Sequence, residues 1–183
     1  MIVLGIDPGS QYTGYGVITC DGSGERALEY GVLRLDRYDE HPLRLKKIYD
    51  EITAIAARVC PDECAIEMPV YGSNPQSMLK LGRAQAAAMI AMLNREIPVT
   101  EYTPKQVKKA VTGRGNASKE QVRYMVRAIL SIKDENDGKA MEADASDALA
   151  VGLCHAHRRA KGETRGPASW KSFLRANPHI VIE

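Results

Sequence analysis

Runs of apolar residues at the start of the chain predict three β-strands. Residues 1–6 (MIVLGI), 14–20 (GYGVITC) and 27–35 (ALEYGVLRL) have the composition of strands, and the turn-rich segments PGSQYTG and DGSGE separate them. Because connections this short join antiparallel neighbours, we expect the three strands to form a meander.

Helical periodicity begins after Leu43. Apolar residues recur there at steps of three and four, which predicts a helix covering one face of the sheet, with Leu45, Ile48, Ile52, Ile55 and Val59 on its inner side. Two further short strands are expected at 64–67 and 98–102. The remaining expected helices cover 75–95, a short stretch from Thr103 with Pro104 in its first turn, a stretch from the N-cap Ser118 to about Leu130, and a last helix from about Met141.

A meander followed by alternating helices and strands predicts an α/β fold, with a five-stranded mixed sheet flanked by helices on both faces. The chain has 183 residues, the size of one ordinary domain. We expect one domain over 1–159 and a basic tail over 160–183. For this tail a flexible segment and a short helix built on Trp170, Phe173 and Leu174 both remain open.

Charge is distributed unevenly although the formal net charge is only +2. Residues 101–127 hold seven bases and two acids, which indicates a polyanionic partner, although such runs are often only solvated surface. The four cysteines lack metal-site spacing and are expected to be free thiols. With no signal-peptide pattern and no apolar stretch of about 20 residues, the sequence predicts a soluble, cytoplasmic protein.

Four carboxylates occur where burial is expected. Asp7 follows the first strand, Glu67 ends the fourth, and Asp144 and Asp147 share one face of the last helix. Each alone is explained by helix capping or by the helix dipole. Together they would repel one another in a dry site unless a cation lay between them. An all-oxygen donor set indicates Mg²⁺ or Mn²⁺, and a pair of such ions can promote hydrolysis of a phosphodiester.

Several sequence blocks, in order, resemble the RuvC family of bacterial Holliday-junction resolvases. They cover about residues 1–157 and read GIDPGSQYTGYGVI, AIE, LKLGRAQA, EYTPKQVKKAVTGRGNASKEQV and ADASDALAVGLCHAH. The resemblance implies a ribonuclease-H-like fold and a homodimer. It also implies magnesium-dependent paired symmetric nicks at four-way DNA junctions during homologous recombination and DNA repair, leaving 5′-phosphate and 3′-hydroxyl ends. A RuvA–RuvB branch-migration complex is the partner that the family implies.

The same resemblance assigns roles to single residues. The catalytic and metal-binding acids are Asp7, Glu67, Asp144 and Asp147, with two Mg²⁺ ions per subunit and Mn²⁺ as a substitute. Lys108 and Lys119 match lysines that the family uses near the scissile strand. Further expected DNA contacts are Lys105, Arg114, Arg123 and Tyr71, where Tyr71 or Val70 replaces the aromatic wedge of the family. His155 and His157 are expected at the surface or facing phosphate, not as ligands.

The alanine-rich helix at 75–95 leaves two interpretations open. Its small side chains suit packing on its own sheet, and they also suit a subunit interface, for which Leu79, Leu81, Gly82 and Ala86 are the candidates. Two rival functions make different demands on the sequence. A junction-binding module without catalysis would require loss of an acid, and an actin- or hexokinase-like phosphotransferase would require about twice this length and a second glycine-rich phosphate loop.

Overall fold

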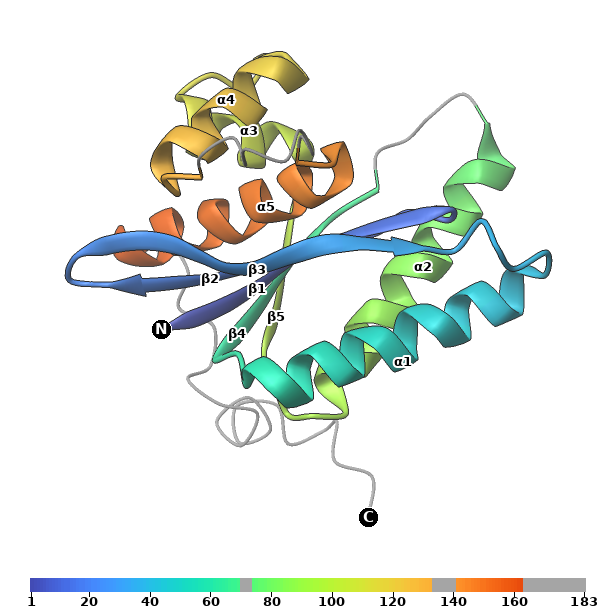
Figure 1. Cartoon of the computed structure of the whole chain (residues 1–183). Helices are drawn as coiled ribbons and strands as arrows, with labels where there is room; N and C mark the ends of the chain where they lie inside the picture. Colours follow the sequence, from blue (N-terminus) through green and yellow to red (C-terminus); the bar gives the residue numbers. More distant parts are fainter. Residues whose placement is uncertain (70–73, 133–140, 163–183) are drawn as a thin grey trace.

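A five-stranded mixed sheet forms the centre of the molecule, seen here in a computed structural model that describes residues 1–69, 74–132 and 141–162 (Figure 1). The strands are β1 (Ile2–Asp7), β2 (Tyr12–Asp21), β3 (Gly24–Arg34), β4 (Glu63–Glu67) and β5 (Val99–Tyr102), in the order β3-β2-β1-β4-β5. The predicted meander is confirmed, since β1 and β3 both pair antiparallel with β2. β4 joins the free edge of β1 in parallel, and β5 extends β4 in parallel.

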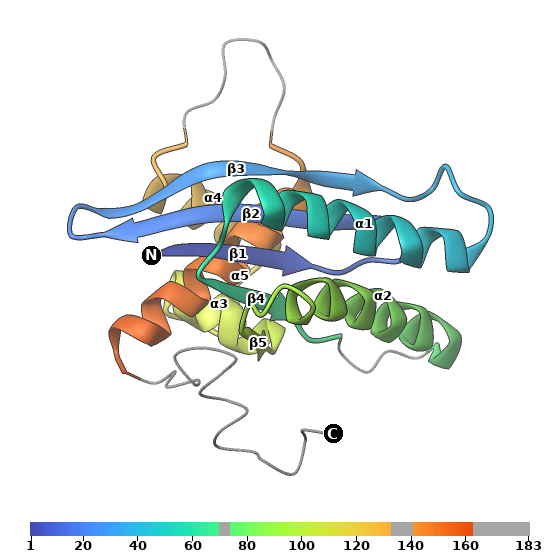
Figure 2. The same ribbon diagram turned by 90° about the horizontal axis from the view of Figure 1, so that it is seen from below.

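Helices cover both faces of this sheet, as the sequence predicts. On one face α1 (His41–Val59) and α2 (Pro75–Leu93) lie side by side (Figure 2). Their buried aliphatic and alanine side chains pack in one apolar cluster with those of the sheet. On the other face α5 (Ala143–Ala160) crosses β1 and β2 directly, and α3 (Pro104–Thr112) and α4 (Lys119–Ile129) pack on α5 (Figure 1). Each face therefore has its own apolar core.

The helix starts follow the local sequence. Thr103 and Ser118 each form a capping box with the glutamine three residues on, which fixes the first turns of α3 and α4. All four cysteines are free, as expected, and none of the described helices is both long and apolar enough to cross a bilayer. The predicted tail at 160–183 begins in the last turn of α5, and from residue 163 it lies outside the described residues.

Candidate active site

Two of the predicted acids lie side by side at one edge of the sheet. Asp7 is the last residue of β1 and Glu67 the last of β4. These strands run parallel with Ile6 opposite Ile66, so the carboxylates that follow occupy neighbouring positions on the face under α5. The pairing of β4 with the free edge of β1 is what brings the two acids together.

The other two acids come from the first turns of α5, which approaches the sheet unusually closely. A Cβ atom on Gly14, the residue opposite Asp7 on β2, would lie 1.9 Å from the backbone oxygen of Asp144. A Cβ atom on Gly5 would lie 2.2 Å from the backbone oxygen of Ala148. Only glycine leaves room for this contact, which carries the acids of α5 down to the level of Asp7.

A pocket of about 310 Å³ opens where these elements meet. Three of the four predicted acids, Asp7, Glu67 and Asp147, line it together. The predicted bases Lys108 and Lys119 line it as well, from α3 and α4. Asp144 is not part of this lining, but its charge acts on Asp7. The structure therefore gathers acids from three elements opposite two cations.

Burial and mutual repulsion make negative charge unfavourable in this pocket. The pKa of Asp7 is raised to about 7, first by burial and then by the charges of Asp147 and Asp144. The pKa of Glu67 is raised to about 8, first by burial and then by Asp7 and Asp147. Lys119 opposes both shifts, and Lys108 opposes the shift of Glu67. The site therefore favours bound positive charge.

Lys119 supplies part of that charge within the protein. It is the first residue of α4, held in place by the Ser118 capping box, and its Nζ lies 3.1 Å from Oδ2 of Asp147. Asp147 is the first cause of the raised pKa of Lys119. The Lys119 side chain is 73% exposed, so its ammonium group remains accessible to a substrate that enters the pocket.

The donor set suits a hard divalent cation, although the carboxylates are not gathered into a finished metal site. In the part of the chain that the structure describes, no three His, Cys, Asp or Glu side chains are placed to hold one ion together. The residues present are nevertheless carboxylates without nitrogen or sulfur donors, the ligands that Mg²⁺ and Mn²⁺ prefer. Their repulsion is also the kind that a divalent ion relieves.

Comparison with known proteins decides the family. The family model for the crossover junction endodeoxyribonuclease RuvC matches residues 3–155. The chain belongs to the RuvC family. A crossover junction endodeoxyribonuclease RuvC of Salinibacter ruber is 52% identical over the full length of both chains.

Solved RuvC structures support the same assignment. RuvC of Thermus thermophilus superposes with a TM-score of 0.80 at 32% identity, covering 89% of this chain and 98% of that one. The same Thermus protein in complex with a Holliday junction substrate gives a TM-score of 0.79 at 30% identity over the same shares. The ribonuclease-H-like fold expected from the sequence is confirmed.

The other predicted DNA contacts lie away from the pocket. Lys105 is exposed and lies over Gly115 in the α3–α4 loop. Arg114 lines a second hollow, described below. Arg123 is half-buried, and after the hydrogen bond with Ser118, which is the main cause, its charge also helps to lower the pKa of Glu120. Val70 and Tyr71 lie outside the described residues, so the wedge of the RuvC family stays a prediction here.

The expectation for His155 was wrong. His155 is fully buried, its Nδ1 lies 2.8 Å from Oη of Tyr102, and its Nε2 lies 2.6 Å from Oε2 of Glu63. Arg159 completes the network by pairing with Glu63 at 2.8 Å. The error has a clear cause: two strands supply the polar partners that allow a histidine to be buried, and helical spacing does not reveal them. His157, by contrast, is half-exposed, with Nδ1 3.2 Å from the backbone oxygen of Ala110.

The apolar side of the pocket was not predicted from the sequence. Pro104, Val107, Val122 and Ala150 line it beside the acids. Their apolar atoms keep water from the carboxylates, and this burial is the main cause of the raised pKa values. Helical periodicity marks Val107 and Val122 as buried, but it cannot show that they border a site.

Proposed function

We propose that the protein is a metal-dependent, structure-specific endonuclease that resolves four-way DNA junctions by paired symmetric nicks. The products would carry 5′-phosphate and 3′-hydroxyl ends, and the reaction would serve homologous recombination and DNA repair. One observation carries the proposal: in a member of the RuvC family, Asp7, Glu67 and Asp147 share a pocket with Lys108 and Lys119. The junction complex of the Thermus relative supports the choice of substrate.

The four acids would bind two Mg²⁺ ions, with Mn²⁺ as a substitute, and such a pair supplies an activated water and stabilises the leaving oxygen of a phosphodiester. Asp7 and Glu67 are fixed at the ends of paired strands, which gives the site a rigid base. Asp144 and Asp147 add donors from the first turns of α5, the helix that packs on this face of the sheet.

The lysines act on the substrate rather than on the metal. The ammonium group of Lys119, beside Asp147 and exposed, can bind a non-bridging oxygen of the scissile phosphate and neutralise charge that develops there. Lys108 enters the pocket from α3, near Glu67, and can hold the same phosphate from a second direction. Apolar lining from Val107 and Val122 keeps bulk water out, which strengthens both interactions.

A homodimer is part of the proposal, because symmetric cutting of a two-fold junction requires two like sites. The exposed side of α2 is the candidate interface. Leu79 is 55% and Ile90 is 51% exposed there, while Ala84, Ala88 and Ala91 pack inward. Both interpretations of the alanine-rich helix are thus compatible with its geometry. Cooperation with a RuvA–RuvB complex rests on family membership alone.

The function is tested by giving the purified protein a synthetic four-way junction with Mg²⁺ and mapping the nicks on denaturing gels. Wild-type protein should nick two like strands symmetrically, and plain duplex should remain uncut. Asp147→Asn should lower the cutting rate at least about 10³-fold while junction binding in EDTA stays within about threefold, because one oxygen donor loses its charge. Asp50→Asn, on the exposed face of α1, is the matched control.

Three outcomes would contradict the proposal. Equal cutting of junction and duplex would argue against a resolvase. Unchanged cutting by Asp147→Asn would overturn the metal assignment. Tight junction binding by wild-type protein without cutting, in either Mg²⁺ or Mn²⁺, would instead indicate a binding module.

A further inference from the structure

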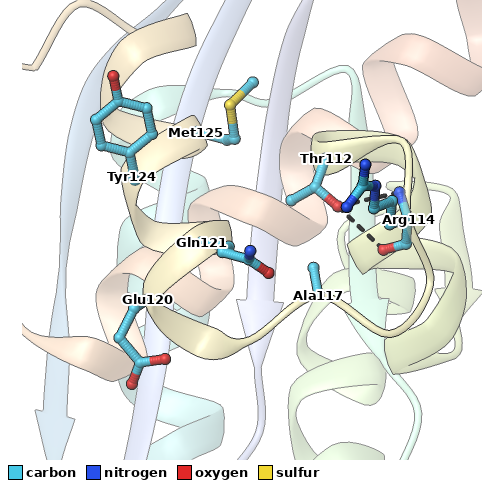
Figure 3. A pocket seen from close by; sticks show the side chains of 7 residues that line it. All are labelled: Thr112, Arg114, Ala117, Glu120, Gln121, Tyr124 and Met125. Atoms are coloured by element: carbon cyan, nitrogen blue, oxygen red, sulfur yellow. Dashed lines mark hydrogen bonds between the residues drawn. The ribbon is translucent and has the colours of Figure 1, made fainter.

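Figure 3 shows a second hollow, of about 480 Å³, between α4 and the α3–α4 loop. Its lining residues on α4 differ from those that line the catalytic pocket. Lys119 and Val122, three residues apart, face the catalytic pocket. Gln121, Tyr124 and Met125 face the hollow, which the α3–α4 loop closes on its other side. One helix therefore separates two concave surfaces.

Tyr124 is unusually exposed for a residue of its size. Its side chain is 72% exposed, more than any other large hydrophobic side chain among the described residues, and its ring stands beside Met125 at the rim of the hollow (Figure 3). Packing within the chain does not explain this position. An open aromatic face is what an unpaired nucleobase stacks on, with about 1–3 kcal/mol lost on substitution by alanine.

Arg114 lies across the hollow from Tyr124, on a loop that hydrogen bonds to Thr112 hold in place. The hydroxyl of Thr112 accepts a hydrogen bond from the backbone N–H of Arg114 at 3.2 Å (Figure 3). Its single proton is shared between the backbone oxygens of Lys108 at 2.8 Å and Arg114 at 3.0 Å. The guanidinium group is exposed and has no ion pair with any acid in the described ranges. It is therefore free to bind phosphate.

The remaining polar groups give the hollow a direction. Glu120 lies at the end away from Arg114, so a phosphate is favoured near Arg114 and disfavoured near Glu120 (Figure 3). Gln121 uses its carboxamide oxygen to accept from the backbone N–H of Ser118 at 2.9 Å. Its NH₂ group then remains available to donate to a base edge.

We propose that this hollow binds one nucleotide of the DNA substrate outside the scissile position, with its base on Tyr124 and its phosphate at Arg114. The volume is in the range of sites that enclose a small organic group. The surrounding segment 101–127, with seven bases and two acids, attracts a polyanion. This inference rests on the proposed function, because it names a second contact for the same substrate.

The contact favours branched over plain duplex DNA. A base can stack on a side chain only after it leaves the duplex stack, and that step costs least where pairing is already interrupted. With the scissile strand in the catalytic pocket, α4 would hold a second, unstacked nucleotide on its far side. The catalytic pocket and the second hollow would then both be occupied only by a branched substrate.

The test compares Tyr124→Ala, Tyr124→Phe and Arg114→Gln with Leu28→Ala, an exposed apolar residue on β3. Affinity for a fluorescent four-way junction is measured in EDTA by anisotropy, so that no cutting occurs. Tyr124→Ala should weaken binding about 10-fold, while Tyr124→Phe should stay within about twofold because its ring can still stack. Arg114→Gln should lower the slope of log affinity against log salt by about one unit, and Leu28→Ala should change nothing.

The source of the nucleotide is distinguished by NMR on ¹⁵N-labelled protein. A thymidine tetranucleotide should shift the Gln121 side-chain amide and the Arg114 signals in wild-type protein but not in Tyr124→Ala, and adenosine monophosphate should have a weaker effect. The assignment to DNA would be overturned by two results together. Adenosine monophosphate would bind saturably at Gln121 and Arg114, and Tyr124→Ala would keep the junction affinity of wild type. Wild-type junction affinity in both Tyr124→Ala and Arg114→Gln would overturn the site altogether.

Failure of this inference differs from failure of the proposed function. If wild-type protein nicks the junction normally and Tyr124→Ala binds it normally, only the second site is lost. If wild-type protein does not nick the junction in either metal, the proposed function fails whatever the affinities are. Urea midpoints of the variants equal to that of wild type show that any loss of affinity is local.

Discussion

Replacing Gly14 with alanine should damage the active site without touching any charged group. The added Cβ would lie 1.9 Å from the backbone oxygen and 2.5 Å from the carbonyl carbon of Asp144. Real Cβ atoms essentially never come within 3.0 Å of another heavy atom, so the first turn of α5 must move by at least about 1 Å. The atoms it meets are backbone, which cannot rotate aside as a side chain can.

The cost follows from the size of this shift. Overpacking a well-packed region costs about 1–3 kcal/mol, and contact with backbone places Gly14→Ala at the upper end of that range. Asp144 and Asp147 move with the turn, while Asp7 and Glu67 stay on their strands. A displacement of about 1 Å in a catalytic group can lower the rate about 10²-fold. The rate should therefore fall more than stability alone explains.

Urea unfolding followed by circular dichroism measures the first effect, and the single-turnover rate of junction cutting in saturating Mg²⁺ measures the second. Both are read at a temperature where each variant is fully folded. Gly22→Ala, in the β2–β3 turn with no neighbouring atom within 4 Å of the added Cβ, is the matched control and should match wild type within about 0.5 kcal/mol. If Gly14→Ala has wild-type stability and rate, the close approach of α5 does not position the acids.

Two further predictions concern buried polar groups. In EDTA, Asp7→Asn should be more stable than wild type by about 4 kcal/mol at pH 8, because the pKa of Asp7 is raised from 3.8 to about 7 on folding. The stability of wild type is therefore fully present below pH 3.8 and is lost as pH rises through about 7. Urea titrations from pH 4 to 8 check this, and a gap that does not shrink toward pH 4 would refute it. His155→Ala should lower the free energy of unfolding by about 3 kcal/mol, since it removes a buried ring, takes the hydrogen-bond partner of Tyr102 Oη and leaves Glu63 paired with Arg159 alone. His157→Ala, on the same helix and half-exposed, should cost less than about 1 kcal/mol, and equal losses in the two variants would contradict the buried network.

The strands and the helices were predictable because each depends on local information. Alternating or continuous apolar runs define β1 to β5, and capping residues such as Thr103 and Ser118 mark where helices begin. Asp7 and Glu67 were conspicuous because each follows an apolar strand directly. Their side-by-side placement depends on the parallel pairing of β4 with β1, which the structure shows.

Only the tertiary structure decided how closely the acids approach and what surrounds them. The sequence contains Gly5 and Gly14, but nothing local shows that the backbone of α5 lies against them. The burial of His155 and the hollow beside Tyr124 likewise arise from residues far apart in the chain. Local periodicity reports which side of an element is buried, whereas distance and dielectric environment depend on which other element covers it, and that is set by packing across the whole fold.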